Sequence, residues 1–477
     1  MTAATLAAGL LLTAAAADAP VSPPGRAAVR SALDRAVRFF RTELAAHGGY
    51  VWRYSRDGAL SEGEAETDGS TVWVQPPGTP RVGEAFLDAY DATGEDDYLR
   101  FAEDAGVALA RGRMQSGGWD YAIFFAPDER AKRGYVDRPA RPAKARGRDR
   151  GNVTTLDDDT TQAAIRFLAR LNDRLGGSNA AVAGAVRAAL DAVVLAQRAN
   201  GGWPQNWDRY PTLNTGQSAP PASVPDDWSR EWRNDWPGRY FLNDDVAGQT
   251  IRALLEGYDR FGDPRYLRTA VRGGEFLQSA RLPEPQPAWA QQYDAGMRPC
   301  WDRKFEPPAV SGEESFDAIG ALIGLAERTG ETRFLDNLGR SLDYLEGLEI
   351  APGMLARFYE LGTGRPLYFT QDYGLTYDGS DVPGHYAFTA PSRVDALRAK
   401  LRRVRAGHAK VEPKPDAAEV GRVIATLDRR GAWVNTSRGM RGFGKASPEG
   451  VIESEQFARN VRLLSRHLTA TRNGDGL

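Results

Sequence analysis

Residues 200–207 read NGGWPQNW, and the Gly-Gly-aromatic triplet inside this stretch occurs three times along the chain. Its copies are Gly48-Gly49-Tyr50, Gly117-Gly118-Trp119 and Gly201-Gly202-Trp203. Each copy ends a segment in which apolar residues recur with helical periodicity. The repeat therefore marks loops that leave successive helices.

A second repeat joins one helical segment to the next. It consists of a glycine, an acidic residue, two free positions, an aromatic residue and a leucine, and its copies begin at Gly94, Gly262 and Gly330. The glycine suits a helix C-cap, and the acid lies near the next helix N-terminus, where the helix dipole favours it.

Helix hairpins followed by Gly-Gly-aromatic loops, when repeated, predict stacked helix pairs. We therefore predict an all-α fold, an (α/α) toroid of repeated helix hairpins with its active-site loops at one mouth. The alternative that the repeats leave open is an irregular α-solenoid. We place the toroid at residues 26–405, followed by a linker and C-terminal helices that pack on it at residues 406–477.

The first nineteen residues, 1–19, combine a short apolar run with a small-residue end at Ala17-Asp18-Ala19, as in a signal peptide. This segment predicts a secreted or periplasmic protein, and the alternative is a disordered N-terminal tail. The run is too short and too rich in alanine to be a membrane span. We therefore expect no membrane partner.

The composition excludes several classes of site. The formal net charge is −2, which gives no indication of a nucleic-acid partner. Cys300 is the only cysteine, so an intrachain disulfide is excluded and a Cys-rich zinc site is not expected. The four histidines are widely scattered, without metal-ligand spacing. We expect a monomer.

Two acidic motifs lie just ahead of helical segments, TTLDDDTTQ at residues 154–162 and FLNDDVAGQ at residues 241–249. Clustered loop carboxylates suit a hard cation such as Ca²⁺, which binds six to eight oxygen ligands. The alternative is helix capping, because an aspartate at a helix N-terminus is stabilising without any ligand.

The stretch RPCWDRKFEPPAVSGEES at residues 298–315 places Arg303 between Trp301 and Phe305 and ahead of two prolines. A solvated surface arginine needs no such setting. We expect the aromatic residues to hold Arg303 rigid and partly desolvated, and burial of this kind lowers the pKa of a cation.

Together these motifs resemble the pectate lyases of polysaccharide lyase family ten, over roughly residues 151–366. NGGWPQ is intact, the family's NDDAM is NDDVA, and its WCAQHD is WAQQYD at residues 289–294. The two further matching stretches are DRKFEPPAVSGEES and ARFYELGTGRP, which end at Ser315 and Pro366.

The resemblance implies calcium-assisted β-elimination of a polyanionic polysaccharide, polygalacturonate. It implies that Asp157 and Asp244 hold Ca²⁺ and that Asp157 also contacts the substrate. Arg303 falls on the position of the catalytic base, and Arg365 falls on an arginine that binds the substrate carboxylate.

Three aromatic residues within the matching motifs are candidates for walls on which sugar rings stack, and core packing is the alternative for each: Trp203, Trp289 and Tyr293. The chain also departs from the family pattern, since Asp302 replaces a small residue beside the catalytic arginine. The basic segment at residues 129–150 is either a solvated insertion or a surface that steers a polyanion.

Other functions remain open at this stage. LDDDT with QRANGGW is also similar to triterpene cyclases, which are α-toroids as well, and paired carboxylates also suit a glycoside hydrolase. A non-catalytic uronan-binding protein is the alternative outside the enzymes, because the residues that follow Arg365 depart from the family pattern.

Overall fold

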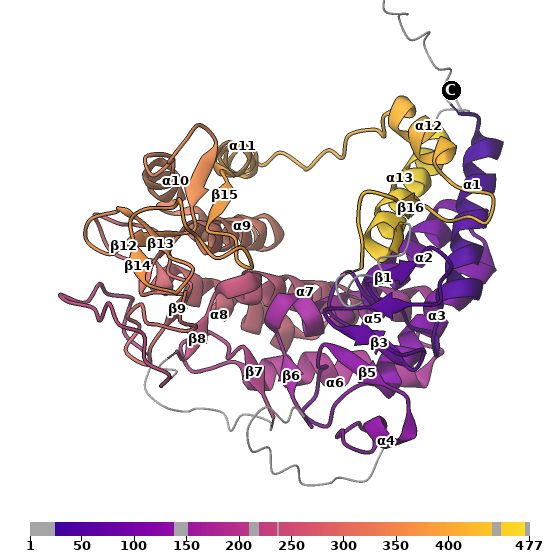
Figure 1. Cartoon of the computed structure of the whole chain (residues 1–477), viewed down its shortest axis with the longest axis horizontal. Coiled ribbons are helices and arrows are strands. Elements are labelled where there is room, and N and C mark those ends of the chain that lie inside the picture. Colours follow the sequence, from indigo (N-terminus) through magenta and orange to yellow (C-terminus); the bar gives the residue numbers. More distant parts are fainter. Residues whose placement is uncertain (1–23, 138–150, 209–218, 236–237, 441–449, 473–477) are drawn as a thin grey trace, which may run out of the picture.

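The computed structural model describes residues 24–137, 151–208, 219–235, 238–440 and 450–472 (Figure 1). The predicted signal peptide lies outside the described residues. Helices dominate the described chain: α1 (Arg26–Phe39), α2 (Thr79–Thr93), α3 (Asp96–Arg111), α4 (Pro127–Arg130), α5 (Thr160–Arg174), α6 (Ala180–Ala196), α7 (Val246–Phe261), α8 (Pro264–Ala280), α9 (Gly312–Thr329), α10 (Leu338–Glu346), α11 (Val394–Arg405), α12 (Ala417–Ala425) and α13 (Ser454–Arg472).

The helices form two layers of an (α/α) toroid. In the inner layer α11, α9, α7, α5, α2 and α13 pack side by side in that order. Helices α3, α6 and α8 pack behind neighbouring members of this row, and α1 packs on α13. The linker 406–416 runs from α11 to α12 and joins the two ends of the row (Figure 1). The predicted toroid is confirmed.

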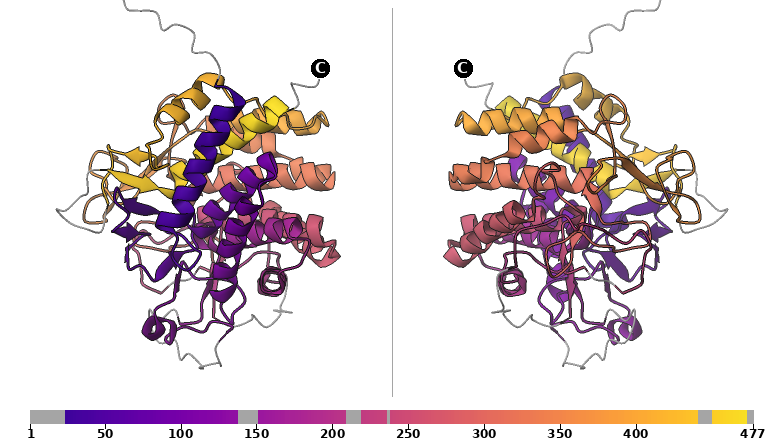
Figure 2. Two further views of the ribbon diagram at one scale, coloured as in Figure 1. Left: turned by 90° about the vertical axis from the view of Figure 1, so that its right-hand side faces the viewer. Right: turned by 90° about the vertical axis from the view of Figure 1, so that its left-hand side faces the viewer.

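Short antiparallel strands and loops gather at one end of the helices (Figure 2). One sheet has the order β16 (Val434–Asn435), β17 (Val451–Glu453), β1 (Arg53–Ser55), β2 (Ser61–Glu62) and β3 (Glu66–Thr67). A second has the order β10 (Ala309–Ser311), β12 (Phe358–Glu360), β13 (Pro366–Phe369) and β14 (Leu375–Thr376). The remaining pairs are β4 (Thr71–Trp73) with β5 (Ala122–Phe124), β6 (Thr154–Thr155) with β7 (Asn206–Trp207), β8 (Tyr240–Phe241) with β9 (Gln292–Tyr293), and β11 (Met354–Ala356) with β15 (Thr389–Pro391).

The Gly-Gly-aromatic loops are locked to the helices that they leave. Gly201 has φ of +92°, and a Cβ there would collide with the carbonyl of Arg272, so the turn requires glycine. The indole N–H of the following Trp203 donates to the carbonyl of Val193 at 3.0 Å. The same bond recurs from Trp119 to Leu109, from Trp289 to Leu277 and from Trp433 to Val423.

A hydroxyl at the start of an inner helix ties several of these loops to the next hairpin. The backbone N–H of Trp119 donates to the Thr161 hydroxyl at 3.1 Å, and that hydroxyl donates to the Trp119 carbonyl. The same reciprocal pair joins Tyr50 to Thr79 and Trp289 to Ser315. The loops at Trp119 and Trp289, which make both kinds of bond, are therefore fixed from both sides.

The glycine-acid repeat forms the turns inside the hairpins, as predicted. Gly94, Gly262 and Gly330 have φ between 66° and 75° and end α2, α7 and α9. Asp263 then caps α8, with its carboxylate accepting from the N–H of Arg265. Left-handed backbone at a helix end favours glycine, which explains why the repeat begins with that residue.

The C-terminal segment is an integral part of the toroid. Helix α13 begins at Ser454 and packs between α1 and α2. The Ser454 hydroxyl donates to the Val51 carbonyl at 2.6 Å, so the last hairpin is joined to the first. Among the described helices, no segment has the length and apolar character needed to cross a membrane.

The indole bond of Trp203 predicts a stability effect. Trp203→Phe removes the N–H donor and part of the buried ring, and it leaves the Val193 carbonyl without its partner. We expect a loss of about 1–3 kcal/mol of unfolding free energy, measured by urea denaturation. Trp119→Phe removes the equivalent bond and should cost a similar amount. An unchanged midpoint in both variants would contradict the proposed lock.

Candidate active site

Two turns of the same conformation carry the acidic motifs. The turn η2 (Asp157–Asp159) precedes α5, and η3 (Asn243–Asp245) precedes α7. The last two residues of each turn have φ between 47° and 60°, and all four are aspartates. Left-handed backbone disfavours residues other than glycine, although aspartate and asparagine tolerate it best. Two matched strained turns at one mouth indicate a constraint beyond helix capping.

These turns bring three carboxylates together. One oxygen each from Asp157, Asp158 and Asp244 lies within 4.8 Å of the other two. Asp157 and Asp158 are partly buried, whereas Asp244 is exposed. Asp157 accepts hydrogen bonds from the Tyr121 hydroxyl at 2.5 Å and from the Gln205 amide at 2.7 Å. Gln205 belongs to the NGGWPQNW stretch, whose Trp203 lock thus orients a donor to the cluster.

The charge of the cluster is not neutralised by its hydrogen-bond donors. The Gln75 amide donates to Asp158 at 2.7 Å, and the Asn243 amide donates to Asp244 at 2.9 Å. Burial, followed by the charges of Asp244 and Asp157, raises the pKa of Asp158 to about 7. A cation at this point would relieve the repulsion, and carboxylate and amide oxygens are the donors that Ca²⁺ prefers.

The residues present therefore fit a calcium ion. Asp157 and Asp244, the ligands expected from the sequence, belong to the cluster, and Asp158 joins them. Asn243 is 3% exposed, and its Oδ1 has no hydrogen-bond partner among the described residues. The sequence motif of three aspartates contained Asp158, but only the tertiary structure shows that it faces Asp244.

The charge of Asp244, a member of the acidic cluster, acts on the guanidinium of Arg303. Its guanidinium carbon stands 4.9 Å from the centroid of the Phe305 ring and 5.5 Å from that of Tyr386. The expected aromatic setting is thus formed by Phe305 and Tyr386. The indole of Trp301 points elsewhere and donates to the Ser229 carbonyl at 2.7 Å.

The protonation state expected for Arg303 needs correction. Arg303 makes a two-point ion pair with Glu306, with Nε at 2.8 Å and Nη2 at 2.5 Å from the carboxylate oxygens. Partial burial lowers the pKa of Arg303, but the hydrogen bonds and charge of Glu306 outweigh burial and hold that pKa above its ordinary value. The expected lowering of the pKa is wrong for this structure, because Glu306 is fully buried opposite the guanidinium.

Arg357 is a second arginine of the site, which the sequence reasoning missed. It lies just before β12 and forms ion pairs with Glu313 and Glu314 at the start of α9. Its guanidinium carbon stands 4.7 Å from the centroid of the Tyr386 ring, and its charge acts on Asp244. Arg357 opens the matching stretch RFYELGTGRP, so the motif itself was the available signal.

Arg365, the arginine chosen from that motif, lies in a different environment. It is exposed, and its guanidinium carbon lies 3.6 Å from the centroid of the Tyr377 ring. Tyr377 in turn donates to Glu360 at 2.7 Å. Arg365 thus contacts Tyr377, which bonds to Glu360, whereas the charge of Arg357 acts on Asp244 of the acidic turn η3.

The three aromatic residues considered as sugar walls are core residues. Trp203, Trp289 and Tyr293 are each no more than 1% exposed. Both indoles form the helix locks described above, and the Tyr293 hydroxyl donates to the Ala280 carbonyl at 2.6 Å. A side chain without accessible surface cannot stack on a sugar in a cleft, so the structure matches the alternative of core packing.

The insertion at residues 219–235 supports the loop that carries Arg303. The indole of Trp301 donates to the insertion at Ser229, and the indole of Trp232 donates back to the carbonyl of Asp302 at 2.7 Å. These reciprocal bonds fix the backbone beside Arg303. This contact between the insertion and the arginine loop is a tertiary feature.

Residues 87–216 match a protein-family model described as pectic acid lyase. Over this segment the chain is pectate-lyase-like. The segment contains Asp157, Asp158 and Gln205, whereas Asp244 and Arg303 lie beyond it. The resemblance predicted from the motifs is confirmed. No curated protein sequence matches the chain.

Several solved structures are similar to this chain. A variant of a family 10 polysaccharide lyase from Cellvibrio cellulosa, in complex with trigalacturonic acid, is 16% identical, with 69% of this chain and 99% of that chain covered and a TM-score of 0.42. A D-mannose isomerase is 13% identical, with 94% and 100% covered and a TM-score of 0.49. Cellobiose 2-epimerase from Spirochaeta thermophila is 14% identical, with 94% and 98% covered and a TM-score of 0.46.

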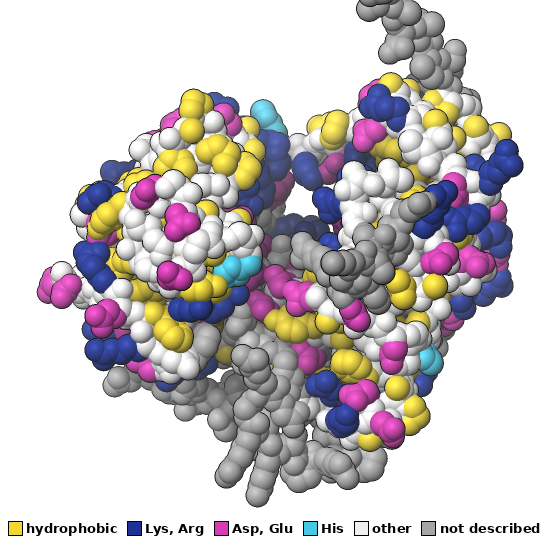
Figure 3. All heavy atoms as spheres, viewed as in Figure 1, with side chains coloured by type: hydrophobic (Ala, Val, Ile, Leu, Met, Phe, Trp, Pro, Cys, Tyr) yellow, Lys and Arg dark blue, Asp and Glu magenta, His cyan; other side chains and the backbone are white. Residues whose placement is uncertain are grey.

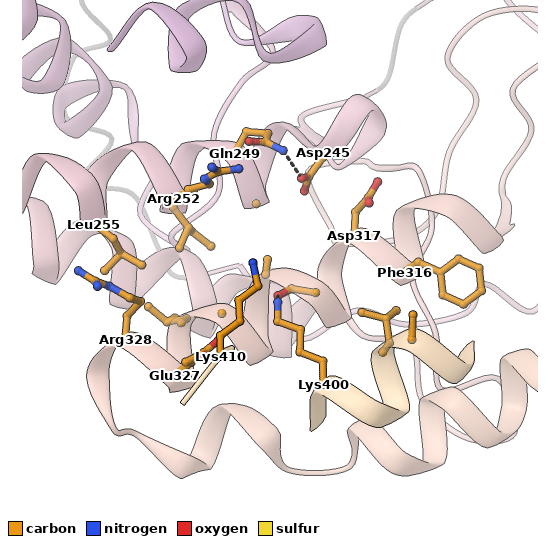
Figure 4. Close-up of a pocket in the computed structure, with 18 of the residues that line it drawn as sticks. Asp245, Gln249, Arg252, Leu255, Phe316, Asp317, Glu327, Arg328, Lys400 and Lys410 are labelled. Atoms are coloured by element: carbon orange, nitrogen blue, oxygen red, sulfur yellow. Dashed lines mark hydrogen bonds between the residues drawn. The ribbon is translucent and has the colours of Figure 1, made fainter. Parts of the chain in front are cut away.

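The acidic turn η3 also borders a cavity inside the toroid. This cavity of about 970 Å³ lies between α7, α9 and α11. Asp245 borders it and bonds to Gln249, while Lys400 and Lys410 extend toward it from the opposite side (Figure 4). The outer surface is hollowed between the two halves of the mouth, and acidic side chains reach this hollow (Figure 3). Two neighbouring aspartates of η3 thus lie in different places: Asp244 belongs to the carboxylate cluster, and Asp245 lines the cavity.

The described part of the basic segment packs on the protein. Arg130 is buried, pairs with Asp137 at 2.6 Å and lies 4.4 Å from the centroid of the Tyr135 ring. Residues 138–150 lie outside the described residues. Steering of a polyanion by the basic segment at residues 129–150 stays a prediction.

The carboxylate cluster predicts a pH effect on stability without calcium. Because the pKa of Asp158 is about 7 when folded and 3.8 ordinarily, the unfolded chain releases this proton at lower pH. Stability is therefore lost as the pH rises from about 4 to about 7. Thermal melting in chelator should show this fall, and Asp158→Asn should flatten it.

Calcium should reverse that loss at neutral pH, because binding to the folded state stabilises it. Terbium luminescence or calorimetry should show that Asp244→Ala weakens binding by about tenfold or more. Asp259→Ala, which changes an aspartate of α7 away from the mouth, is the matched control. Equal affinity in wild type and Asp244→Ala would remove Asp244 from the cation site.

Proposed function

We propose that the protein is a polysaccharide lyase that cleaves polygalacturonate by calcium-assisted β-elimination. The observation that carries the proposal is the carboxylate cluster at the toroid mouth, with Arg303 and Arg357 within electrostatic reach of Asp244. The family match over residues 87–216 supports the same activity. The two arginines and a cation held by the aspartates would supply positive charge for a substrate that carries a carboxylate on every sugar.

β-Elimination removes the C5 proton of a uronate and expels the oxygen at C4. The C5 proton is weakly acidic, so the negative charge that develops toward the neighbouring carboxylate must be stabilised. A calcium ion, when bound by Asp157, Asp158 and Asp244, supplies positive charge for that carboxylate. Arg303 adds a second positive charge at the same mouth, and the Glu306 ion pair orients its planar guanidinium.

In this proposal Arg357 contributes positive charge and does not take part in the proton transfer. Because it is paired with Glu313 and Glu314, its position is fixed, and its positive charge balances part of the acidic cluster. Tyr386 lies over both guanidinium groups and donates to Glu306 at 3.0 Å. The two arginines therefore need little rearrangement when charge develops on a substrate, which is the condition for electrostatic catalysis.

The polymeric substrate also supports the predicted location outside the cytoplasm. A polyuronate chain does not diffuse across a membrane, so an enzyme that acts on it is expected to be secreted or periplasmic. We propose further that the protein acts as a monomer, with a polyanionic polysaccharide as its partner.

Absorbance at ultraviolet wavelengths tests the activity directly. A lyase creates a C4=C5 double bond conjugated to the carboxylate, so wild-type protein with polygalacturonate and calcium should produce absorbance. Chelator should abolish the signal, and added calcium should restore it. Reducing ends without absorbance would indicate a hydrolase. Binding without either product would indicate a non-catalytic uronan-binding protein.

Arg303 provides the second test. Arg303→Ala and Arg303→Lys should lower kcat by about 10²–10⁴, because both lose the planar guanidinium that pairs with Glu306. Calcium binding should persist, since Arg303 is not a ligand. Arg365→Ala is the matched control and should keep near-normal turnover, given its exposed position over Tyr377. Near-normal kcat in Arg303→Ala would exclude Arg303 from the reaction.

A further inference from the structure

Lys304 is an exposed lysine that stands beside Arg303 at the tip of a tight turn. The N–H of Glu306 donates to the Arg303 carbonyl at 2.9 Å, so Lys304 and Phe305 occupy the two central positions of a β-turn. The Glu306 carboxylate also accepts from the N–H of Arg303 at 3.2 Å, which fixes the base of the turn. Lys304 is exposed, whereas Phe305 is buried. The turn therefore presents a lysine at a defined place next to the arginine of the site.

The charge of Lys304 is held in place by an aromatic ring. Its Nζ lies 3.3 Å from the centroid of the Tyr373 ring, which is a cation–π contact. Among the residues that the structure describes, no carboxylate pairs with this ammonium. An ammonium has three N–H donors, and the face of one ring does not accept from all of them. The positive charge of Lys304 is thus fixed in position but available to an anion.

The rings that support Lys304 and Arg303 belong to one aromatic cluster. Tyr373 packs on Phe305 with ring centroids 5.8 Å apart, and Phe305 packs on Tyr386 at 4.7 Å. The Arg303 guanidinium lies over Phe305 and Tyr386, and Lys304 lies over Tyr373. These ring contacts place the two cations side by side at the mouth of the toroid.

Tyr373 occupies a backbone conformation that tyrosine rarely adopts. It lies in the turn between β13 and β14 with φ of +65°, and its N–H donates to the Thr370 carbonyl at 2.8 Å. Glycine adopts left-handed backbone without strain, whereas a bulky residue does not. A strained tyrosine at this point indicates that its ring has a function. The turn follows Arg365, where the chain departs from the family pattern, so this ring contact is a feature of this chain.

We propose that Lys304, seated on Tyr373, binds the carboxylate of the uronate that adjoins the sugar at Arg303. The inference rests on the proposed function and names a second part of the substrate that the mouth recognises. Polygalacturonate carries one carboxylate on each sugar. Two cations on neighbouring rings can therefore pair with the carboxylates of two consecutive sugars, with the ammonium N–H groups of Lys304 donating to the second carboxylate.

This contact makes Lys304 a determinant of specificity for free carboxylates. Methyl esterification of the adjoining sugar removes the negative charge that the ammonium binds. An ester carbonyl still accepts a hydrogen bond, but a bond between a cation and a neutral acceptor is weaker than one to a carboxylate. The protein should therefore prefer stretches of consecutive free uronates, and the preference equals the difference between the two affinities.

Binding of trigalacturonate, measured by titration calorimetry in calcium, tests the assignment. Arg303→Ala provides a background that cleaves slowly. Lys304→Met in this background keeps most of the side-chain stem and removes the charge, so binding should weaken about fivefold, as for the loss of an exposed ion pair. Lys304→Arg keeps the charge and should keep most of the affinity. Lys414→Met, at an exposed lysine of the linker 406–416, is the matched control.

Tyr373→Gly separates the ring from the fold. Glycine suits the left-handed backbone, so thermal melting should persist or rise. Trigalacturonate binding should nevertheless weaken, because Lys304 loses the ring that holds it. Retained affinity together with unchanged melting would show that the ring does not position Lys304 for the substrate.

The three trigalacturonates that carry a single methyl ester, each on a different sugar, locate the contact. In the Arg303→Ala background, the ester on the adjoining sugar should weaken binding about fivefold. With Lys304→Met added, that ester should bind as well as the free acid, while the effects of the other two esters should stay unchanged. Equal effects of all three esters with and without Lys304 would assign the recognition of this sugar to other residues.

Steady-state kinetics separate binding from the reaction itself. Lys304→Met in the otherwise wild-type protein should raise KM about fivefold and keep kcat nearly unchanged, because the adjoining sugar is bound equally in the ground state and the transition state. Unchanged affinity, or a lowered kcat with an unchanged KM, would overturn the inference. Failure of the proposed function is distinct: the wild-type protein would then produce no ultraviolet absorbance, and the binding measurements would still test Lys304.

Discussion

The mutual repulsion of Asp157, Asp158 and Asp244 is the constraint on which the candidate site depends. Their oxygens lie within 4.8 Å of one another, on turns whose backbone adopts the left-handed conformation. Both features oppose folding, since like charges repel and a left-handed aspartate is strained. A protein retains such an arrangement where a ligand offsets its cost, and the oxygen-rich donor set suits a hard cation. The charge of Asp244 also interacts with those of Arg303 and Arg357, the two arginines of the site.

The helices of the toroid hold the loops that carry these carboxylates in place without a bound ligand. Indole bonds such as Trp203 to Val193 close a loop on the helix that it leaves, and hydroxyl pairs such as Thr161 with Trp119 close a loop on the next helix. Tryptophan combines a large buried ring with one donor, so a single residue anchors both the packing and the backbone. Gln205, two residues beyond Trp203, consequently meets Asp157 at 2.7 Å.

Charge pairing divides the ionisable groups of the mouth into two sets. Glu306 and Glu314 are buried acids that hold Arg303 and Arg357 in place. Asp302 and the carboxylate cluster are instead left without a basic side-chain partner among the described residues, and the pKa values of Asp302 and Asp158 are raised to about 7. Groups of the first kind are structural supports, whereas unpaired groups of the second kind are available to a cation, a substrate or a proton.

The sequence by itself determined the helix hairpins, the turns at Gly94, Gly262 and Gly330, and the acidic turns, because periodicity and left-handed backbone depend on local residue types. It also indicated Asp157, Asp244 and Arg303 through their motifs. Only the tertiary structure decided which residues face one another. It placed Trp203 in the core, Arg357 rather than Arg365 near the acidic turns, and Glu306 against Arg303. Burial and ion pairing depend on residues far apart in the chain, so a motif specifies a side chain but not the field in which it acts.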